Sequence, residues 1–118
     1  MTTLIACLST GRGTWSTVAK LIDSADWEKV ILVTPFAKDR FKADGKKVEI
    51  IQFNENLRIE ELIKFLVDEL AKRIVGIEVA VNLTSGSGYE HMALLSALIK
   101  LGVGIRFVIP SDDGVKEV

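Results

Sequence analysis

The fold of this chain is decided by the stretch IEVAVNLTSGSG, residues 77–88. Its first part, Ile77 to Leu83, is an apolar run rich in β-branched residues, which predicts a buried strand. Its second part, Thr84 to Gly88, contains only hydroxyl-bearing residues and glycines. A helical pattern follows from about Tyr89 to Leu101, with Gly102 as its stop. We therefore expect a strand-to-helix turn that cradles a phosphate, because glycine admits a close anion and a helix N-terminus offers unpaired amides.

Working outward, four further apolar runs predict strands. They are Leu4–Leu8, Lys29–Thr34, Lys47–Phe53 and Ile105–Ile109. Amphipathic stretches lie between them. One carries Trp15, Val18, Ala19 and Ile22, and the clearest carries Ile59, Leu62, Ile63, Leu66, Leu70 and Ile74. For the latter helix Asn56 is the expected N-cap and Gly76 the expected end. Residues 36–42 are expected to form a short helix or turn, and residues 43–45 a turn.

This alternation of strands and helices predicts an α/β fold. We expect a single Rossmann-like, doubly wound domain over residues 1–110. Its sheet should have five mostly parallel strands in an order of about 3-2-1-4-5, with helices on both faces. Residues 111–118 are expected to be a polar, frayed C-terminal tail.

Composition excludes several classes of function. The 118 residues carry a net charge of −1, so no basic field is expected to attract duplex nucleic acid. One cysteine, Cys7, and one histidine, His91, cannot build an internal disulfide or a zinc centre, although magnesium held by carboxylates stays open. No secretory signal opens the chain and no apolar run approaches the length of about 18 residues that spans a membrane, so a cytoplasmic location is expected.

Two loops are the candidates for chemistry. In open α/β sheets, ligands bind beyond the carboxyl ends of strands where the winding reverses, which here falls between the first and fourth strands. The loops at that place are the most glycine- and hydroxyl-rich of the chain. Their residues are Ser9, Thr10, Gly11, Arg12, Gly13 and Thr14, and Thr84, Ser85, Gly86, Ser87 and Gly88. The structural alternative is that such residues are ordinary in tight turns and helix caps.

Common cofactor fingerprints do not fit these loops. The turn after the first strand lacks the third glycine of the dinucleotide motif, and the second strand ends in Thr34-Pro35 without an acidic residue for a ribose. No P-loop pattern is present. No cofactor is therefore expected. His91, on the first turn of the last helix, either faces the crevice or is a partly exposed polar residue at a helix start.

The last predicted helix is apolar on nearly all sides, with Ser96 and Lys100 as its only polar breaks after Met92. Such a helix must be buried on more than one side. One side can pack on the sheet. The other is expected to meet a second copy of the chain, and the alternative is that neighbouring helices cover it.

The segment from Val81 through Met92 resembles the Asn-x-Thr-Gly-Gly-x-x-x-Met signature of CARF domains, the CRISPR-associated Rossmann-fold sensors of antiviral defence. The Ser/Thr- and Gly-rich turn after the first strand is similar to the second ligand loop of that family. One departure is plain, because Ser85-Gly86 stands where the family often has Gly-Gly.

The resemblance implies a homodimer that binds a cyclic oligoadenylate across its two-fold interface. Ser9, Thr10, Gly11, Arg12 and Thr14 would line one side of the ligand, and Thr84, Ser85, Gly86 and Ser87 would hold its phosphates. Many relatives attach an effector after the sensor, so the chain is expected to be a stand-alone sensor or a piece of a longer protein. A further option is a metal-independent ring nuclease, for which Ser9, Arg12 and His91 are the candidate catalytic residues. The alternative outside this family is a generic nucleotide- or phosphometabolite-binding domain.

Overall fold

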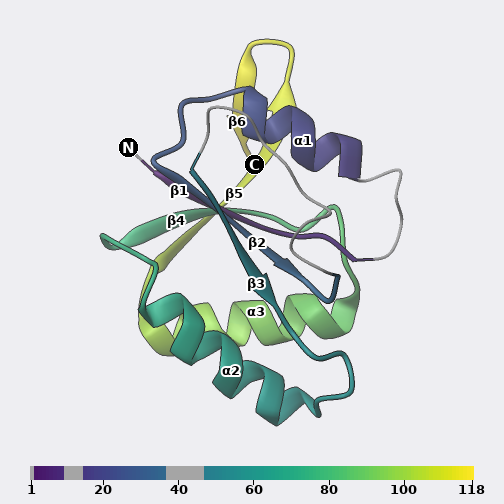
Figure 1. Cartoon of the computed structure of the whole chain (residues 1–118). Helices are drawn as coiled ribbons and strands as arrows, with labels where there is room; N and C mark the ends of the chain where they lie inside the picture. The colour runs from purple at the N-terminus through teal and green to yellow at the C-terminus, as the bar shows by residue number, and fades with distance from the viewer. Residues whose placement is uncertain (1, 10–14, 37–46) are drawn as a thin grey trace.

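The computed structural model describes residues 2–9, 15–36 and 47–118, and these form an α/β arrangement (Figure 1). Its elements in chain order are β1 (Thr3–Cys7), α1 (Trp15–Asp23), β2 (Lys29–Thr34), β3 (Val48–Gln52), α2 (Ile59–Ala71), β4 (Glu78–Asn82), α3 (Gly88–Leu101), β5 (Gly104–Ser111) and β6 (Gly114–Glu117). The predicted structures over residues 36–42 and 43–45 lie outside the described residues, except Phe36, which belongs to no helix or strand.

The strands form one mixed sheet of order β3-β2-β1-β4-β5-β6. The first five strands in this order are parallel, so the predicted order is confirmed for them. The predicted count of five strands is wrong, because β6 pairs with β5 in the antiparallel sense, with Ser111 opposite Gly114. Gly114 has a φ of 118°, which L side chains rarely adopt, so it allows the tight reversal. The sequence signal was Asp113-Gly114, a common hairpin dipeptide, within the stretch expected to fray.

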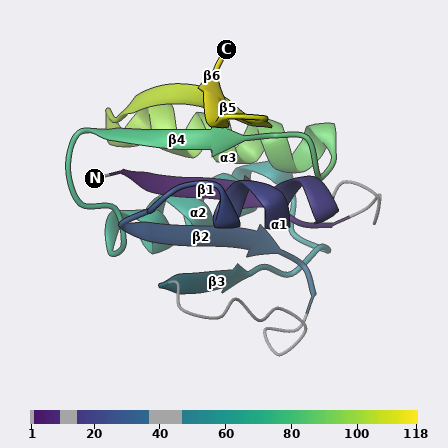
Figure 2. The same cartoon turned by 90° about the horizontal axis from the view of Figure 1, so that it is seen from above.

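Helices cover both faces of the sheet, as expected (Figures 1 and 2). Successive strand residues point to opposite faces, so β1 divides its side chains between two cores. Leu4 and Ala6 pack with α1, whereas Ile5 and Cys7 pack with α2 and α3. The helix residues buried against the sheet are Val18, Leu21 and Ile22 of α1, Leu62, Leu66 and Leu70 of α2, and Ala93, Leu94, Ala97 and Leu98 of α3.

Helix ends differ from the expectations at α2 and agree at α3. The N-cap of α2 is Arg58, whose backbone amide donates to Glu61 Oε1 at 3.0 Å, and not Asn56. Asn56 instead belongs to the preceding turn, where its amide donates to Asn54 Oδ1. The helix ends at Ala71, before the predicted end at Gly76. For α3, Gly102 is the C-cap with a left-handed φ of 74°, as the pattern predicted.

A network of charges joins the end of α2 to the edge of the sheet. The guanidinium of Arg73 lies 2.8 Å from Glu49 Oε1 and 3.0 Å from Glu69 Oε1. Lys29 lies 3.2 Å from the other oxygen of Glu49. Burial raises the pKa of Glu49, but the hydrogen bonds from Arg73 and Lys29 outweigh burial and leave this pKa below its ordinary value. The folded state therefore favours the ionised carboxylate.

Glu49→Gln should lower the free energy of unfolding by about 1 kcal/mol at pH 7, because it removes a half-buried, charge-assisted pair. A depressed pKa contributes stability above the unfolded pKa, near 4.5, and this contribution is lost as the pH falls through the lower folded pKa. Urea unfolding at pH 7 and at pH 3 checks this, and the difference between the two proteins should be smaller at pH 3 than at pH 7. Glu78→Gln, which breaks a more exposed pair with Arg106, is the control and should have the smaller effect. A Glu49→Gln deficit that is equal at both pH values contradicts the prediction.

Candidate functional site

The winding of the sheet reverses between β1 and β4. β1 pairs with β2 on one side and with β4 on the other, so the connections after β1 and β4 leave in opposite directions. α1 follows on one face of the sheet and α3 on the other (Figure 2). Ser9 lies just beyond β1, and residues 83–87 join β4 to α3. We call the described part of this place the switch-point site, made of Ser9, Asn82, Thr84, Ser85, Gly86, Ser87, Glu90 and His91.

Glu90 connects the two sides of the switch-point site. Its Oε1 accepts a hydrogen bond from Ser9 Oγ at 2.5 Å and another from the backbone amide of Ser87 at 2.9 Å. The amide of Glu90 in turn donates to Ser87 Oγ at 3.3 Å, which completes a capping box at the start of α3. Sequence reasoning missed Glu90. The signal that could have found it is the spacing Ser87-x-x-Glu90, a capping-box pattern.

Gly86 packs so closely against its neighbours that no side chain would fit. Its φ is 103°, and a Cβ built there would lie 2.9 Å from Cys7 Cβ, from Glu90 Oε1 and from His91 Nε2. The positive φ expected of a glycine in this loop is found at this position, whereas the expected close approach of an anion stays a prediction. The close neighbours are atoms of the protein itself.

Asn82 and Thr84 organise the beginning of the loop. The side-chain amide of Asn82 donates to the carbonyl of Val108 on β5 at 2.8 Å. Its Oδ1 accepts from the amide of Thr84 at 3.2 Å and from Thr84 Oγ1 at 2.6 Å. The hydroxyl hydrogen of Thr84 is therefore used within the loop, and Asn82 holds the carboxyl end of β4 to its neighbouring strand.

Within the described residues, the donors that remain for a ligand at this site include two hydroxyls and two backbone amides, all of them neutral. Ser85 is 1% exposed, and its Oγ has no hydrogen-bond partner in the structure. Ser87 Oγ accepts from Glu90, which leaves its hydroxyl hydrogen available. The backbone amides of Gly88 and Tyr89, at the first two positions of α3, have no intrahelical acceptor. These groups form a set of donors at a helix N-terminus, which can bind an anion.

His91 is half-buried with its ring bonded to the backbone, and Cys7 is fully buried. His91 Nε2 lies 2.8 Å from the carbonyl of Ser85, and because a carbonyl only accepts, this nitrogen carries the hydrogen. Cys7 is buried, and burial together with the nearby charge of Glu90 raises the pKa of its thiol to about 12. The thiol is thus protonated at neutral pH and cannot act as a nucleophile there.

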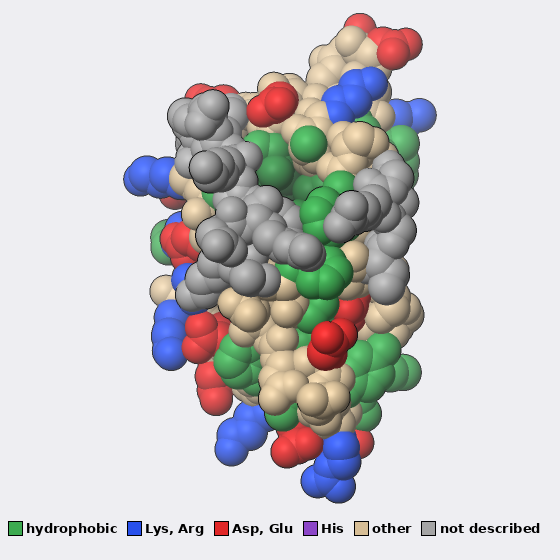
Figure 3. All heavy atoms as spheres, turned by 45° about the vertical axis from the view of Figure 1, so that its right-hand side comes forward, with side chains coloured by type: hydrophobic (Ala, Val, Ile, Leu, Met, Phe, Trp, Pro, Cys, Tyr) green, Lys and Arg blue, Asp and Glu red, His purple; other side chains and the backbone are tan. Residues whose placement is uncertain are grey.

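The structure brings together one part of the predicted residue set. Ser9, from the first loop, meets Ser87 of the second loop through Glu90. The other predicted residues of the first loop, namely Thr10, Gly11, Arg12, Gly13 and Thr14, lie outside the described residues. In the view of Figure 3, the coloured Lys and Arg side chains lie mostly near the edges, and both hydrophobic and acidic side chains lie between them. The donors described above for this part of the site are hydroxyls and backbone amides.

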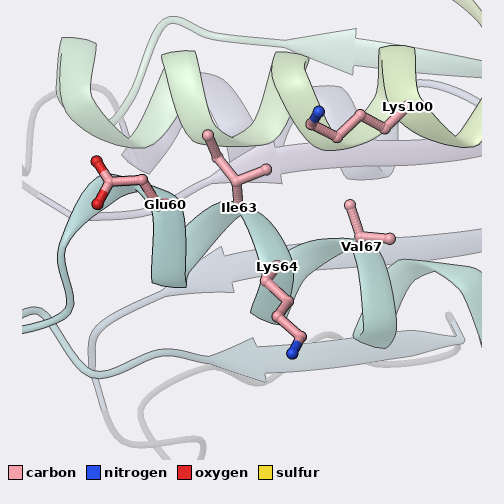
Figure 4. A pocket seen from close by; sticks show the side chains of 5 residues that line it. All are labelled: Glu60, Ile63, Lys64, Val67 and Lys100. Atoms are coloured by element: carbon pink, nitrogen blue, oxygen red, sulfur yellow. The ribbon is translucent and has the colours of Figure 1, made fainter.

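Other hollows lie elsewhere on the molecule. One of about 450 Å³ is lined by Glu60, Ile63, Lys64, Val67 and Lys100, between α2 and α3 (Figure 4). Another of about 540 Å³ lies beyond the carboxyl ends of β2 and β3, lined by Pro35, Gln52, Phe53, Asn54, Glu55 and Asn56. Neither includes a residue of the switch-point site. Within residues 2–9, 15–36 and 47–118, no cluster of three His, Cys, Asp or Glu side chains suits a metal ion.

No helix in the described part of the chain is long and apolar enough to cross a membrane. Comparison with known proteins found no family model that matches the chain and no curated protein that matches it.

Proposed function

We propose that this chain is a Rossmann-like sensor domain that binds a cyclic oligoadenylate, resembling the CARF domains. The observation that carries the proposal is the contact between the two predicted loops. Ser9, beyond β1, and Ser87, before α3, both donate a hydrogen bond to Glu90 Oε1. This contact lies where the winding of the sheet reverses, and ligands of open α/β sheets bind at that place. The alternation of parallel strands with helices on both faces supports the Rossmann-like description.

The available donors suit a phosphodiester. The amides of Gly88 and Tyr89 lie at the positive end of the α3 dipole, and a single negative charge is stabilised there. The hydroxyl of Ser85 is buried without a partner, and an unsatisfied buried hydroxyl favours a ligand that supplies an acceptor. Ser87 adds a further hydroxyl hydrogen. We infer that the phosphates of the ligand lie against this end of α3.

The exposure of the outer residues of α3 supports the proposal of a dimer through this helix. Met92 is 63% exposed and Ile99 is 69% exposed, although both are large and apolar. Phe107 on β5 is 40% exposed. α2 packs beside α3 and covers part of its surface. The alternative that neighbouring helices cover the apolar helix therefore holds for that part. The exposed remainder supports a second copy of the chain as the partner, and a two-fold ligand would fit a two-fold site.

Among the described residues, no specific contact supports cleavage of the ligand. Ser9 donates its hydroxyl hydrogen to Glu90, and His91 Nε2 donates to a backbone carbonyl. The third candidate for a ring nuclease, Arg12, lies outside the described residues. We therefore propose binding and not hydrolysis as the activity of this domain.

Isothermal titration calorimetry with cyclic tetra-adenylate and cyclic hexa-adenylate tests the function. We expect one of them to bind with a stoichiometry of about one ligand per two chains. Sedimentation at the same protein concentration should give a dimer. Absence of heat with both ligands contradicts the proposal, and binding of a mononucleotide to a monomer would favour the generic nucleotide-binding alternative.

Ser85→Ala should weaken binding of the cyclic ligand by about fivefold while leaving stability almost unchanged. The reason is that Ser85 Oγ has no partner to lose in the free protein, so the loss falls on the ligand contact alone. Calorimetry and thermal unfolding measure the two effects. Ser96→Ala, further along α3, is the matched control and should change neither. A destabilised Ser85→Ala protein with unchanged affinity would show that the hydroxyl serves the fold.

A further inference from the structure

A groove between α2 and α3 leaves apolar surface open on the side of the helices that faces away from the sheet. It is the hollow of about 450 Å³ lined by Glu60, Ile63, Lys64, Val67 and Lys100, and we call it the α2–α3 groove (Figure 4). Ile63 and Val67 point from α2 toward α3, and the side chain of Lys100 extends from α3 along the groove. Both apolar side chains are half-buried, because their inner sides pack against the core. Their outer sides therefore form an apolar floor.

The rim of the α2–α3 groove carries a net positive charge. Lys64 and Lys100 form no ion pair with a carboxylate in the described part of the chain. Glu60, the carboxylate that lines the groove, lies 4.0 Å from Arg58, and the other carboxylates of α2 do not line it. The chain as a whole has a net charge of −1, so the positive rim is a local feature. A complementary partner is apolar along its centre and acidic beside it.

The shape of the groove favours a helix as the occupant. Its lining residues come from two helices only, so it is open along its length, whereas a pocket for a small molecule encloses about 70–90% of the surface of its ligand. Helices use their backbone donors and acceptors internally, so the groove has no strand edge to which an extended peptide could add. Ile63 and Val67, four residues apart, form one ridge of α2, and the ridge of a further helix can pack beside it.

We propose that the α2–α3 groove binds an acidic amphipathic helix of a partner protein. Apolar residues of that helix, spaced i, i+3, i+4 and i+7, pack on Ile63 and Val67, and Asp or Glu residues on its flanks meet Lys64 and Lys100. The inference goes beyond the proposed function and does not depend on it. None of the exposed apolar residues that support the proposed dimer lines the groove.

Two designed peptides test the inference. Each has about 18 residues, which is long enough for a helix in water, and carries Leu at the i, i+3, i+4 and i+7 spacing. One has Glu on both flanks of the apolar stripe, the other has Lys at the same positions, and both have Ala and Gln elsewhere. Fluorescence anisotropy of a labelled peptide at low salt measures binding. We expect the acidic peptide to bind about tenfold more tightly than the basic one, although the protein has a net negative charge.

Lys100→Glu tests the contribution of the rim. Lys100 is exposed in the last turn of α3, so reversing its charge should leave the fold intact. The variant should bind the acidic peptide about fivefold more weakly and the basic peptide more tightly. Lys20→Glu is the matched control, because Lys20 is exposed in the last turn of α1, on the opposite face of the sheet. It changes the net charge equally and should alter neither affinity, and thermal unfolding checks that both variants are folded.

Amide chemical shifts locate the bound peptide. They should change at Ile63, Val67 and Lys100 and stay unchanged at Val115, which packs on the α1 face of the sheet. Equal affinity for the two peptides, equal effects of the two variants, or shifts confined to another surface would overturn the proposal.

Two other occupants would appear as different results. A dimer in sedimentation that Lys100→Glu disrupts and Lys20→Glu leaves intact would assign the groove to a second copy of the chain. Retention on vesicles of phosphatidylcholine and phosphatidylserine that only Lys100→Glu abolishes would assign it to an anionic membrane. Either result overturns the proposal of a partner helix. None of these measurements involves a cyclic adenylate, so they leave the test of the proposed function separate.

Discussion

Gly86→Ala is expected to lower the free energy of unfolding by about 3 kcal/mol, which is the largest effect of any loop substitution that we predict. Two costs add. A left-handed backbone costs an L residue about 1–2 kcal/mol, and forcing a methyl group into filled space costs about 1–3 kcal/mol. The space is filled because Cys7 Cβ, Glu90 Oε1 and His91 Nε2 would each lie 2.9 Å from the new carbon. Urea unfolding followed by circular dichroism measures the loss.

Two other glycines separate these costs. Gly76 has a φ of 98° with no atom within 4 Å of a built Cβ, so Gly76→Ala should show the backbone cost alone, about 1 kcal/mol. Gly88 begins α3, is not left-handed and is equally open, so Gly88→Ala should be neutral or slightly stabilising. Similar losses for Gly86→Ala and Gly76→Ala would mean that the loop makes room for the methyl group, contrary to the packing described above.

Leu94→Ala should destabilise the protein by about 3 kcal/mol, through the lost transfer free energy and the cavity left behind. Leu94 is 0% exposed and belongs to the core that joins α3 to α2 and to the sheet. The same helix carries the matched control, Ile99, which is 69% exposed. Ile99→Ala should change the stability of the monomer by less than about 0.5 kcal/mol.

Both variants are measured by urea unfolding at a protein concentration where the monomer prevails. Sedimentation at higher concentration then adds a second readout for Ile99→Ala, which should weaken the proposed dimer. A Leu94→Ala protein as stable as the parent would contradict the assignment of this face of α3 to the core. A large loss of monomer stability in Ile99→Ala would show that its side is covered within one chain.

The strands of the parallel sheet were predictable because each is a dense apolar run bounded by glycine, proline or polar residues. β2 and β4 are buried along nearly their whole length, and they were found from their β-branched residues. The C-cap of α3 was predicted correctly because the preference of glycine for a left-handed C-cap is local and does not depend on tertiary contacts. The N-cap of α2 was misplaced at Asn56, since the Asx turn that Asn54 forms with the amide of Asn56 ends before the helix begins.

The candidate site was only partly predictable. Sequence spacing indicated both loops, and strand order brought Ser9 near the loop after β4. Glu90 was missed because its contact with Ser9 joins residues far apart in the chain, although its capping of Ser87 is local. The hydroxyls of Thr84 and Ser9 were expected to face a ligand. In the structure each hydrogen is donated within the protein, because buried or crowded hydroxyls bond to the nearest acceptor.

The sequence by itself determined the alternation of strands and helices, the order of the five parallel strands and the loops at the reversal of winding. These follow from periodicity and from the handedness of crossovers, which are local or general properties. Only the tertiary structure decided that β6 pairs with β5 as an edge strand, that Gly86 packs against Cys7 and that Glu90 joins the two loops. Such contacts depend on which distant groups folding brings within about 3 Å, a distance that hydrogen bonds and close packing require but that spacing along a chain does not encode.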